Sequence, residues 1–147
     1  MRLGIWVVVP RHQIGVGVVC FNDRNQILLL RHVFHPTAPW GIPGGWLNRN
    51  ESPAECAIRE LREETGITQV TLGQVVQIFK DAPPQHLGIT YIASIEQDPV
   101  QLSSEIMEWR WFETDKLPTM FSSVKQSIEK AVRIQEKEEH WLETVDG

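Results

Sequence analysis

The sequence predicts an α/β fold in which a mixed β-sheet lies between helices. Three observations favour it: several runs rich in valine and isoleucine, one internal helix with complete start and stop signals, and a second helix near the C-terminus. A chain of 147 residues, of which 41% are hydrophobic, is large enough to bury one core. We therefore expect a single domain over residues 1–147.

Strands are expected where branched apolar residues run together. The first two runs, 4–9 and 14–21, are separated by P-R-H-Q, and a turn at 21–27 leads to a third run through Arg31. The G-V-G-V-V within the second run lacks the third glycine of a dinucleotide loop, so we interpret it as small residues in a strand. Residues 36–50 hold three prolines and three glycines, which predicts a shaped loop or short strands. Further strands are expected at about 70–80, 86–95 and 109–113.

The internal helix has well-marked ends. Ser52 is the expected N-cap, Pro53 takes the first helical position, Glu55 completes an S-x-x-E capping box, and Gly66 ends the helix. The residues expected to face the core are Ala54, Ala57, Ile58 and Leu61 here, and Val124, Ile128, Ala131 and Val132 in a last helix that opens at Ser122 or Ser123.

Composition argues against several classes of function. The formal net charge of −5 gives no basic footprint, which disfavours binding to long nucleic acid or to an anionic membrane. Cys20 and Cys56 have no metal-type spacing, so both are expected to be reduced and buried. The N-terminus has no cleavage site of the signal-peptide type, and no apolar stretch approaches the roughly 18 residues that span a membrane. We expect a cytoplasmic protein.

Three glutamates are crowded into the internal helix, where residues 59–67 read R-E-L-R-E-E-T-G-I. At about 100° per residue, Glu60 and Glu64 lie roughly 40° apart, and like charges at this spacing repel each other. Arg59 is expected to pair with Glu63 and to leave Glu60 and Glu64 facing the same space. Oxygen ligands of this kind suit Mg²⁺ or Mn²⁺, so a divalent cation would explain the crowding. A solvated charged face is the alternative interpretation of this pattern alone.

A longer pattern includes this helix. From Gly45 the chain runs G-W-L-N-R-N-E-S-P-A-E-C-A-I-R-E-L-R-E-E-T-G-I, which resembles the signature of the Nudix hydrolase family, G-x5-E-x7-R-E-U-x-E-E-x-G-U with U aliphatic, at every specified position. The resemblance implies a Nudix-type α/β/α sandwich. It also implies Mg²⁺-dependent cleavage of the pyrophosphate of a nucleoside diphosphate linked to another moiety, which gives a nucleoside monophosphate and a phosphate ester.

The resemblance also implies roles for single residues. Glu60, Glu63 and Glu64 would bind metal, Arg59 would orient a glutamate, Glu51 would support the start of the helix, and the carbonyl of Gly45 would approach the metal. The general base would be a glutamate of the helix or an acidic residue from a later loop. We prefer Glu105 to Glu108, because Glu108 abuts a strand and can instead pair with Arg110.

Substrate selection is less clearly marked. Pro83 follows the motif at a spacing similar to one associated with the family's ADP-ribose hydrolases, so ADP-ribose or a nucleotide sugar is favoured. Arg31 is a candidate for a phosphate contact, with a plain surface arginine as the alternative. Trp40, Trp46 and Phe79 are candidates for stacking on a base, with packing as the alternative.

Two other functions remain open. One is a pyrophosphohydrolase of nucleoside triphosphates or of RNA 5′ ends, although the acidic balance and the lack of a basic stripe count against long RNA. The other is a nucleotide-sensing module without activity. A small nucleotide is the expected partner, and a homodimer is left open. His32, His35 and His86 are assigned no role.

Overall fold

A computed structural model describes residues 12–34, 40–81 and 86–145 of the chain. Its strands are β1 (Gln13–Phe21), β2 (Ile27–His32), β3 (Trp40–Gly41), β4 (Gly44–Trp46), β5 (Val70–Asp81), β6 (His86–Ile95) and β7 (Ile106–Phe112), and its helices are α2 (Pro53–Thr65) and α3 (Ser122–Val145). The strand expected at 4–9 lies outside the described residues. The other expected strands are confirmed, although β7 begins three residues before the position expected from the sequence.

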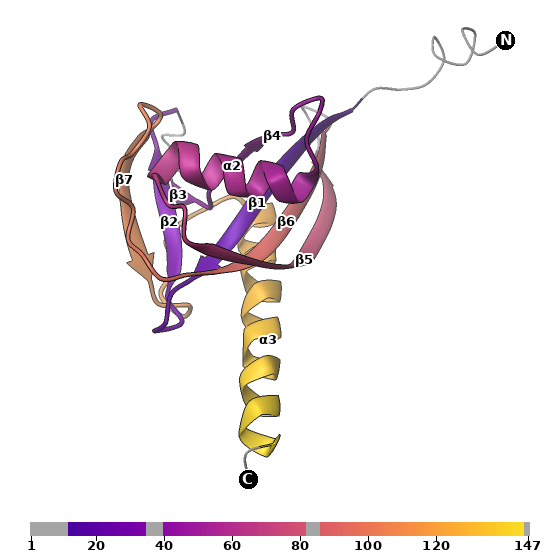
Figure 1. Cartoon of the computed structure of the whole chain (residues 1–147), viewed down its shortest axis with the longest axis vertical. Coiled ribbons are helices and arrows are strands. Elements are labelled where there is room, and N and C mark those ends of the chain that lie inside the picture. Colours follow the sequence, from indigo (N-terminus) through magenta and orange to yellow (C-terminus); the bar gives the residue numbers. More distant parts are fainter. Residues whose placement is uncertain (1–11, 35–39, 82–85, 146–147) are drawn as a thin grey trace, which may run out of the picture.

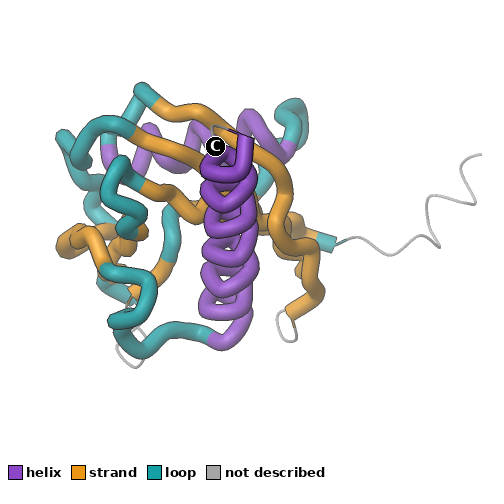
Figure 2. Tube along the Cα trace, turned by 90° about the horizontal axis from the view of Figure 1, so that it is seen from below, coloured by secondary structure: helices purple, strands orange, loops and turns teal. Residues whose placement is uncertain are grey.

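The seven strands form one sheet in the order β3-β2-β1-β6-β5, with β4 paired to β1 and β7 paired to β2. The β1–β6 pair is parallel and the other pairs are antiparallel, so the sheet is mixed. The two helices cover opposite faces of the sheet, as Figures 1 and 2 show. The predicted mixed sheet between helices is confirmed.

Each helix packs on its own hydrophobic core. Alternate residues of β1 point to opposite faces, so Val18 joins the core under α2 while Val19 joins the core under α3. Because both faces of the central strands are buried, β1 and β2 are nearly continuous apolar runs in the sequence. Ile128 and Ala131 of α3 are fully buried, as predicted. None of the helices in the described part of the chain is long and apolar enough to cross a membrane.

The ends of α2 follow the sequence signals. The Ser52 hydroxyl accepts the Glu55 N–H, and the Glu55 carboxylate accepts the Ser52 N–H, which completes the capping box. Gly66 ends the helix with φ of 76°, in the left-handed region that glycine enters without strain. The prediction that Ile58 faces the core is wrong, because this residue is 39% exposed. The buried side of α2 is instead turned toward Glu64, which is only 5% exposed.

Candidate active site

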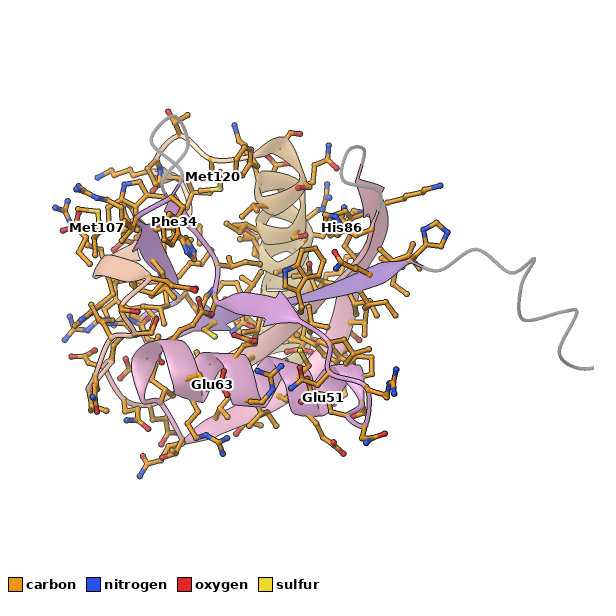
Figure 3. All side chains as sticks on the ribbon, turned by 90° about the horizontal axis from the view of Figure 1, so that it is seen from above. Phe34, Glu51, Glu63, His86, Met107 and Met120 are labelled. Carbon is orange, nitrogen blue, oxygen red and sulfur yellow. The ribbon has the colours of Figure 1, made fainter. Side chains whose placement is uncertain are left out.

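The glutamates of α2 face the short strand β4 and differ in burial. The side chain of Glu60 is 15% exposed and that of Glu63 is 53% exposed. Figure 3 shows Glu51 close to the start of α2 and Glu63 farther along the same helix, with β4 lying beside it. The fold therefore places buried and exposed carboxylates next to one another along one flank of α2.

Arg59 links these carboxylates to the loop that precedes the helix. Its Nε and Nη2 donate to the two oxygens of Glu51, at 2.9 and 2.7 Å. Its Nη1 donates to Glu60 at 2.8 Å and to Glu63 at 3.0 Å. Nη2 also donates to the backbone carbonyl of Trp46 at 3.0 Å, which ties α2 to β4. One guanidinium thus holds three carboxylates and one strand.

These contacts bear on two expectations for Arg59. The predicted pairing with Glu63 is confirmed. Nη1 also reaches the neighbouring Glu60, a contact that the expected pairing did not include. The double hydrogen bond from Arg59 also lowers the pKa of Glu51 to about 2. Glu51 is therefore a fixed anion that supports the helix start.

Glu64 occupies the most enclosed position of the three. Its Oε1 accepts a hydrogen bond of 2.7 Å from the backbone N–H of Gly44. Burial, the largest cause, and the charges of Glu60 and Glu105 together raise the pKa of Glu64 to about 8, against the lowering effect of the hydrogen bond from Gly44. Burial also raises the pKa of Glu60. Both carboxylates are costly to ionise in the protein alone, and a bound cation would offset that cost.

Two glycines of β4 allow the backbone to approach these carboxylates. A Cβ on Gly45 would collide with the carboxylate of Glu60. A Cβ on Gly44 would collide with the carbonyl oxygen of Val16 on the paired strand β1. The space that a side chain would fill at Gly45 is therefore taken by a carboxylate.

The donors on α2 and β4 fit a hard divalent cation, which prefers carboxylate and carbonyl oxygens. Within residues 12–34, 40–81 and 86–145, no group of three or more His, Cys, Asp or Glu side chains is gathered as a metal cluster. The hydrogen bonds explain this, because Arg59 holds Glu60 and Glu63 while Gly44 holds Glu64. A cation would compete with Arg59 Nη1 for two of its ligands.

The two candidates for the general base have different surroundings. Glu105 is exposed just before β7, its backbone oxygen accepts the N–H of Val33, and its charge acts on Glu64. Glu108 lies inside β7 and not in the loop where it was expected. It pairs with Arg31 at 3.1 Å and with Arg110 at 3.4 Å. The expected Glu108–Arg110 contact is confirmed, and the partner strand supplies a second arginine.

A cleft of about 630 Å³ opens beside β4, between the sheet and the first turns of α3. The glycines at positions 15, 17 and 88 line its sheet side, and the ring of Phe79 lies against Gly88, where a Cβ would collide with it. Trp46 lies at the cleft, 47% exposed, with its ring edge-on to His86 at 5.1 Å between centroids. Another hollow of about 500 Å³, lined by Asn22 and Trp111 among others, contains none of the α2 glutamates.

The cleft contains polar groups that sequence reasoning missed. Ser127 and Thr90, both almost fully buried, line it, and their hydroxyl oxygens are 3.1 Å apart. Ser127 also donates to the side-chain oxygen of Gln77 at 3.2 Å. Helical periodicity places Ser127 next to the apolar face of α3, but it does not indicate that the hydroxyl lines a cleft. The G-V-G-V-V stretch was the available signal for the open sheet surface.

The remaining candidate residues either pack in or against the core or lie outside the described residues. Trp40 packs edge-on against Phe112 at 5.1 Å, with Arg110 over its ring, which supports the packing alternative. Cys20 and Cys56 are free and buried, as expected. Pro83 and His35 lie outside the described residues.

Comparison with known proteins places the chain in a family. The family model described as NUDIX domain matches residues 11–132. The RNA pyrophosphohydrolase of Caulobacter vibrioides is 30% identical over 145 residues, covering 84% of this chain and 84% of that protein. The 8-oxo-dGTP diphosphatase of Proteus vulgaris is 36% identical over 86 residues, covering 56% of this chain and 75% of that protein. Among solved structures, the MutT protein from Methanosarcina mazei Go1 is 26% identical with a TM-score of 0.70, covering 87% of this chain and 98% of that one.

The chain therefore belongs to the NUDIX domain family. Its sheet between two helices is the fold of that family. It is a Nudix pyrophosphohydrolase, an enzyme that acts on phosphoanhydride bonds.

Proposed function

We propose that this enzyme removes pyrophosphate from the 5′-triphosphate end of RNA, with Mg²⁺ or Mn²⁺ as its cofactor. The observation that carries the proposal is the similarity to an RNA pyrophosphohydrolase over 84% of both chains. A further relative is named for 8-oxo-dGTP, which is also a triphosphate. The substrate favoured from the sequence, ADP-ribose or a nucleotide sugar, depended on Pro83, which lies outside the described residues, and the relatives named here favour the alternative.

The α2 carboxylates and the Gly45 carbonyl would hold the divalent cation, which supplies charge neutralisation at the phosphates and a more acidic water. Arg59, anchored on Glu51, keeps Glu60 and Glu63 on the correct flank of the helix. Glu105 is the residue that we assign as the general base, because it is exposed and acts electrostatically on Glu64. Triphosphate hydrolysis would then need only groups on α2, β4 and the segment before β7.

The cleft is the place that we assign to the first nucleoside. Its glycine-lined sheet surface and the Phe79 ring offer an apolar contact for a base, while Thr90 and Ser127 offer hydroxyl groups to polar edges. Trp46 would bound the cleft on the β4 side, close to the phosphates. Arg31 is engaged with Glu108, so its phosphate contact would require that ion pair to open.

The test is a substrate panel measured with Mg²⁺: a 5′-triphosphorylated oligonucleotide, GTP, 8-oxo-dGTP and ADP-ribose. We expect the highest kcat/KM for the oligonucleotide, with pyrophosphate and a 5′-monophosphate end as products. The Glu64→Gln protein and excess chelator serve as controls and should abolish all turnover. ADP-ribose as the best substrate would contradict the proposal and restore the sugar diphosphate alternative.

A further inference from the structure

The helix α3 carries a basic stripe that the net charge of the chain conceals. Lys130, Arg133, Lys137 and His140 follow one another at intervals of three, four and three residues. At about 100° per residue, they share an arc of roughly 80° on the helix surface. The acidic residues of the same stretch all fall outside this arc; they are Glu129, Glu136, Glu138, Glu139 and Glu143. The basic side chains therefore form one arc, which Glu129, Glu136 and Glu143 border on the side of His140.

The basic stripe is exposed and available. All four side chains are exposed, and no ion pair between described residues involves the two lysines or Arg133. Arg133, Lys137 and His140 line one surface hollow of about 480 Å³ together with Glu136, Trp141 and Thr144. The Trp141 side chain is 64% exposed, which is unusual for so large an aromatic residue.

The turn between β1 and β2 contacts the C-terminal part of α3 away from the basic stripe. Asn25, in the turn between β1 and β2, donates to Glu139 at 2.6 Å and accepts from Gln135 at 3.3 Å. Figure 1 shows the C-terminal part of α3 extending past the sheet. These contacts use Gln135 and Glu139, which lie outside the arc of the basic stripe, so the stripe and Trp141 stay exposed.

We propose that the basic stripe and Trp141 bind the RNA chain that follows the 5′ nucleotide. This inference rests on the proposed function, because the RNA end must first occupy the active site. The first turns of α3 line the cleft through Ser123 and Ser127, and the stripe begins one turn later at Lys130. Its ten-residue length is about 15 Å at the helical rise, which matches roughly four nucleotides of a stacked strand.

Each part of the surface has a defined task in this arrangement. The cationic side chains contact successive phosphates without reading the sequence. Trp141 provides a ring for a base to stack on, which is also tolerant of sequence. The enzyme would therefore favour long 5′ ends over free nucleotides without selecting a particular RNA sequence beyond the first nucleotide.

The test compares 5′-triphosphorylated RNAs of two and ten nucleotides with GTP. The variant Arg133→Gln/Lys137→Gln removes two charges from the stripe, and Arg24→Gln/Lys116→Gln removes two charges from exposed positions outside α3. We expect the stripe variant to raise KM for the ten-nucleotide RNA about tenfold or more and to leave KM for GTP and kcat unchanged. The control variant should match the wild type with every substrate.

Salt dependence gives a second readout. Each phosphate contact to a single strand contributes about 0.7 to the slope of log affinity against log salt concentration. The stripe variant should therefore have a slope shallower by about 1.4 for the ten-nucleotide RNA. Trp141→Ala should raise KM for that RNA with an unchanged slope, since stacking releases no counterions.

Binding without turnover separates this inference from the proposed function. Fluorescence anisotropy with a ten-nucleotide RNA that carries a 5′-hydroxyl needs no hydrolysis, so it reports on the stripe even if RNA is not hydrolysed. Weaker binding by the stripe variant and unchanged binding by the control would support the surface. Equal affinities and equal salt slopes for the wild type and both variants would overturn it.

Discussion

Arg59 donates two hydrogen bonds, of 2.9 and 2.7 Å, to the carboxylate of Glu51, and these two bonds hold the guanidinium at the centre of the acidic site. The remaining nitrogen, Nη1, is shared by Glu60 and Glu63. Because Glu51 anchors two of the three nitrogens, Arg59 can stay in place when Glu60 and Glu63 turn toward a cation. The arginine neutralises part of the acidic helix, and a bound cation would displace the contacts of only one of its nitrogens.

The first prediction concerns this anchor. Glu51→Gln should lower activity or metal affinity by about 10- to 100-fold, the range typical of residues that position metal ligands. The amide replaces one accepting oxygen by an NH2 group that cannot accept from arginine, so Arg59 loses the paired hydrogen bonds that fix its position. Steady-state kinetics as a function of Mg²⁺ concentration would show the loss as a higher requirement for metal. An unchanged metal requirement would show that the anchor has no role in catalysis.

Arg59 itself should be replaceable by neither alanine nor lysine. Arg59→Ala leaves the largely buried carboxylates of Glu51 and Glu60 without their partner, so both turnover and melting temperature should fall. Arg59→Lys keeps the charge but cannot bind Glu51 through two nitrogens. Calorimetry measures the melting temperature of both variants, and steady-state kinetics measure kcat. Full activity in the lysine variant would show that the two-nitrogen contact with Glu51 is not required.

Glu64→Gln should lower kcat by more than 100-fold and leave the fold intact. The glutamine oxygen can still accept the Gly44 N–H, so β4 stays in place, but the charge that a cation needs is gone. Without metal, the melting temperature should hold or rise, since a buried carboxylate next to like charges has been removed. Circular dichroism melts in excess chelator provide the comparison. A clear loss of stability in chelator would contradict this account of Glu64.

Stability without metal should fall as pH rises from about 4.5 to about 8. In the unfolded chain Glu64 ionises at the ordinary value of 4.5, whereas burial raises its pKa to about 8 in the folded protein. Over this interval the folded state binds the extra proton, so the free energy of unfolding decreases with pH. Urea denaturation in chelator at pH 5 and pH 8 would measure the decrease. In Glu64→Gln the fall in the free energy of unfolding between pH 5 and pH 8 should be smaller. An equal fall in that variant would show that other groups cause it.

Gly45→Ala should damage the site without removing any charged group. Its new Cβ would collide with the Glu60 carboxylate, so Glu60 must move away from β4. We expect at least a tenfold loss in kcat/KM. Gly41→Ala is the matched control, because its Cβ would make only ordinary contact with the His32 ring at 3.6 Å. Equal activity in both variants would show that the close approach at Gly45 is not required.

Local signals explain how much of this molecule could be predicted from its sequence. The capping box at Ser52 and Glu55 and the stop at Gly66 depend on neighbouring residues, so α2 was bounded correctly. The link between Arg59 and Glu51 depends on how the preceding loop packs, which helical geometry does not contain. The burial of Glu64 and the exposure of Ile58 likewise depend on which side of α2 meets the sheet. Helical periodicity predicts the apolar stripe of α2 to within about one residue, and tertiary packing decides which residues at its edges face the sheet.

The same limit applies to the cleft and to α3. Ser127 and Thr90 are about 40 residues apart and meet only because α3 lies across β6. The basic stripe was missed because whole-chain charge averages over both sides of the helix. A helical projection of α3 by charge, in place of hydrophobicity, would have shown it.

The parallel pairing of β1 with β6 governs when the site can form. The paired residues, from Gln13–His86 to Phe21–Ser94, lie about 70 positions apart in sequence. The capped helix α2 and strand β4 lie in the chain between them, and β6 supplies part of the cleft. Such distant contacts close slowly, since the intervening chain must lose its freedom first. During synthesis on the ribosome, α2 can therefore form early, but the cleft has to wait until β6 has emerged and docked beside β1.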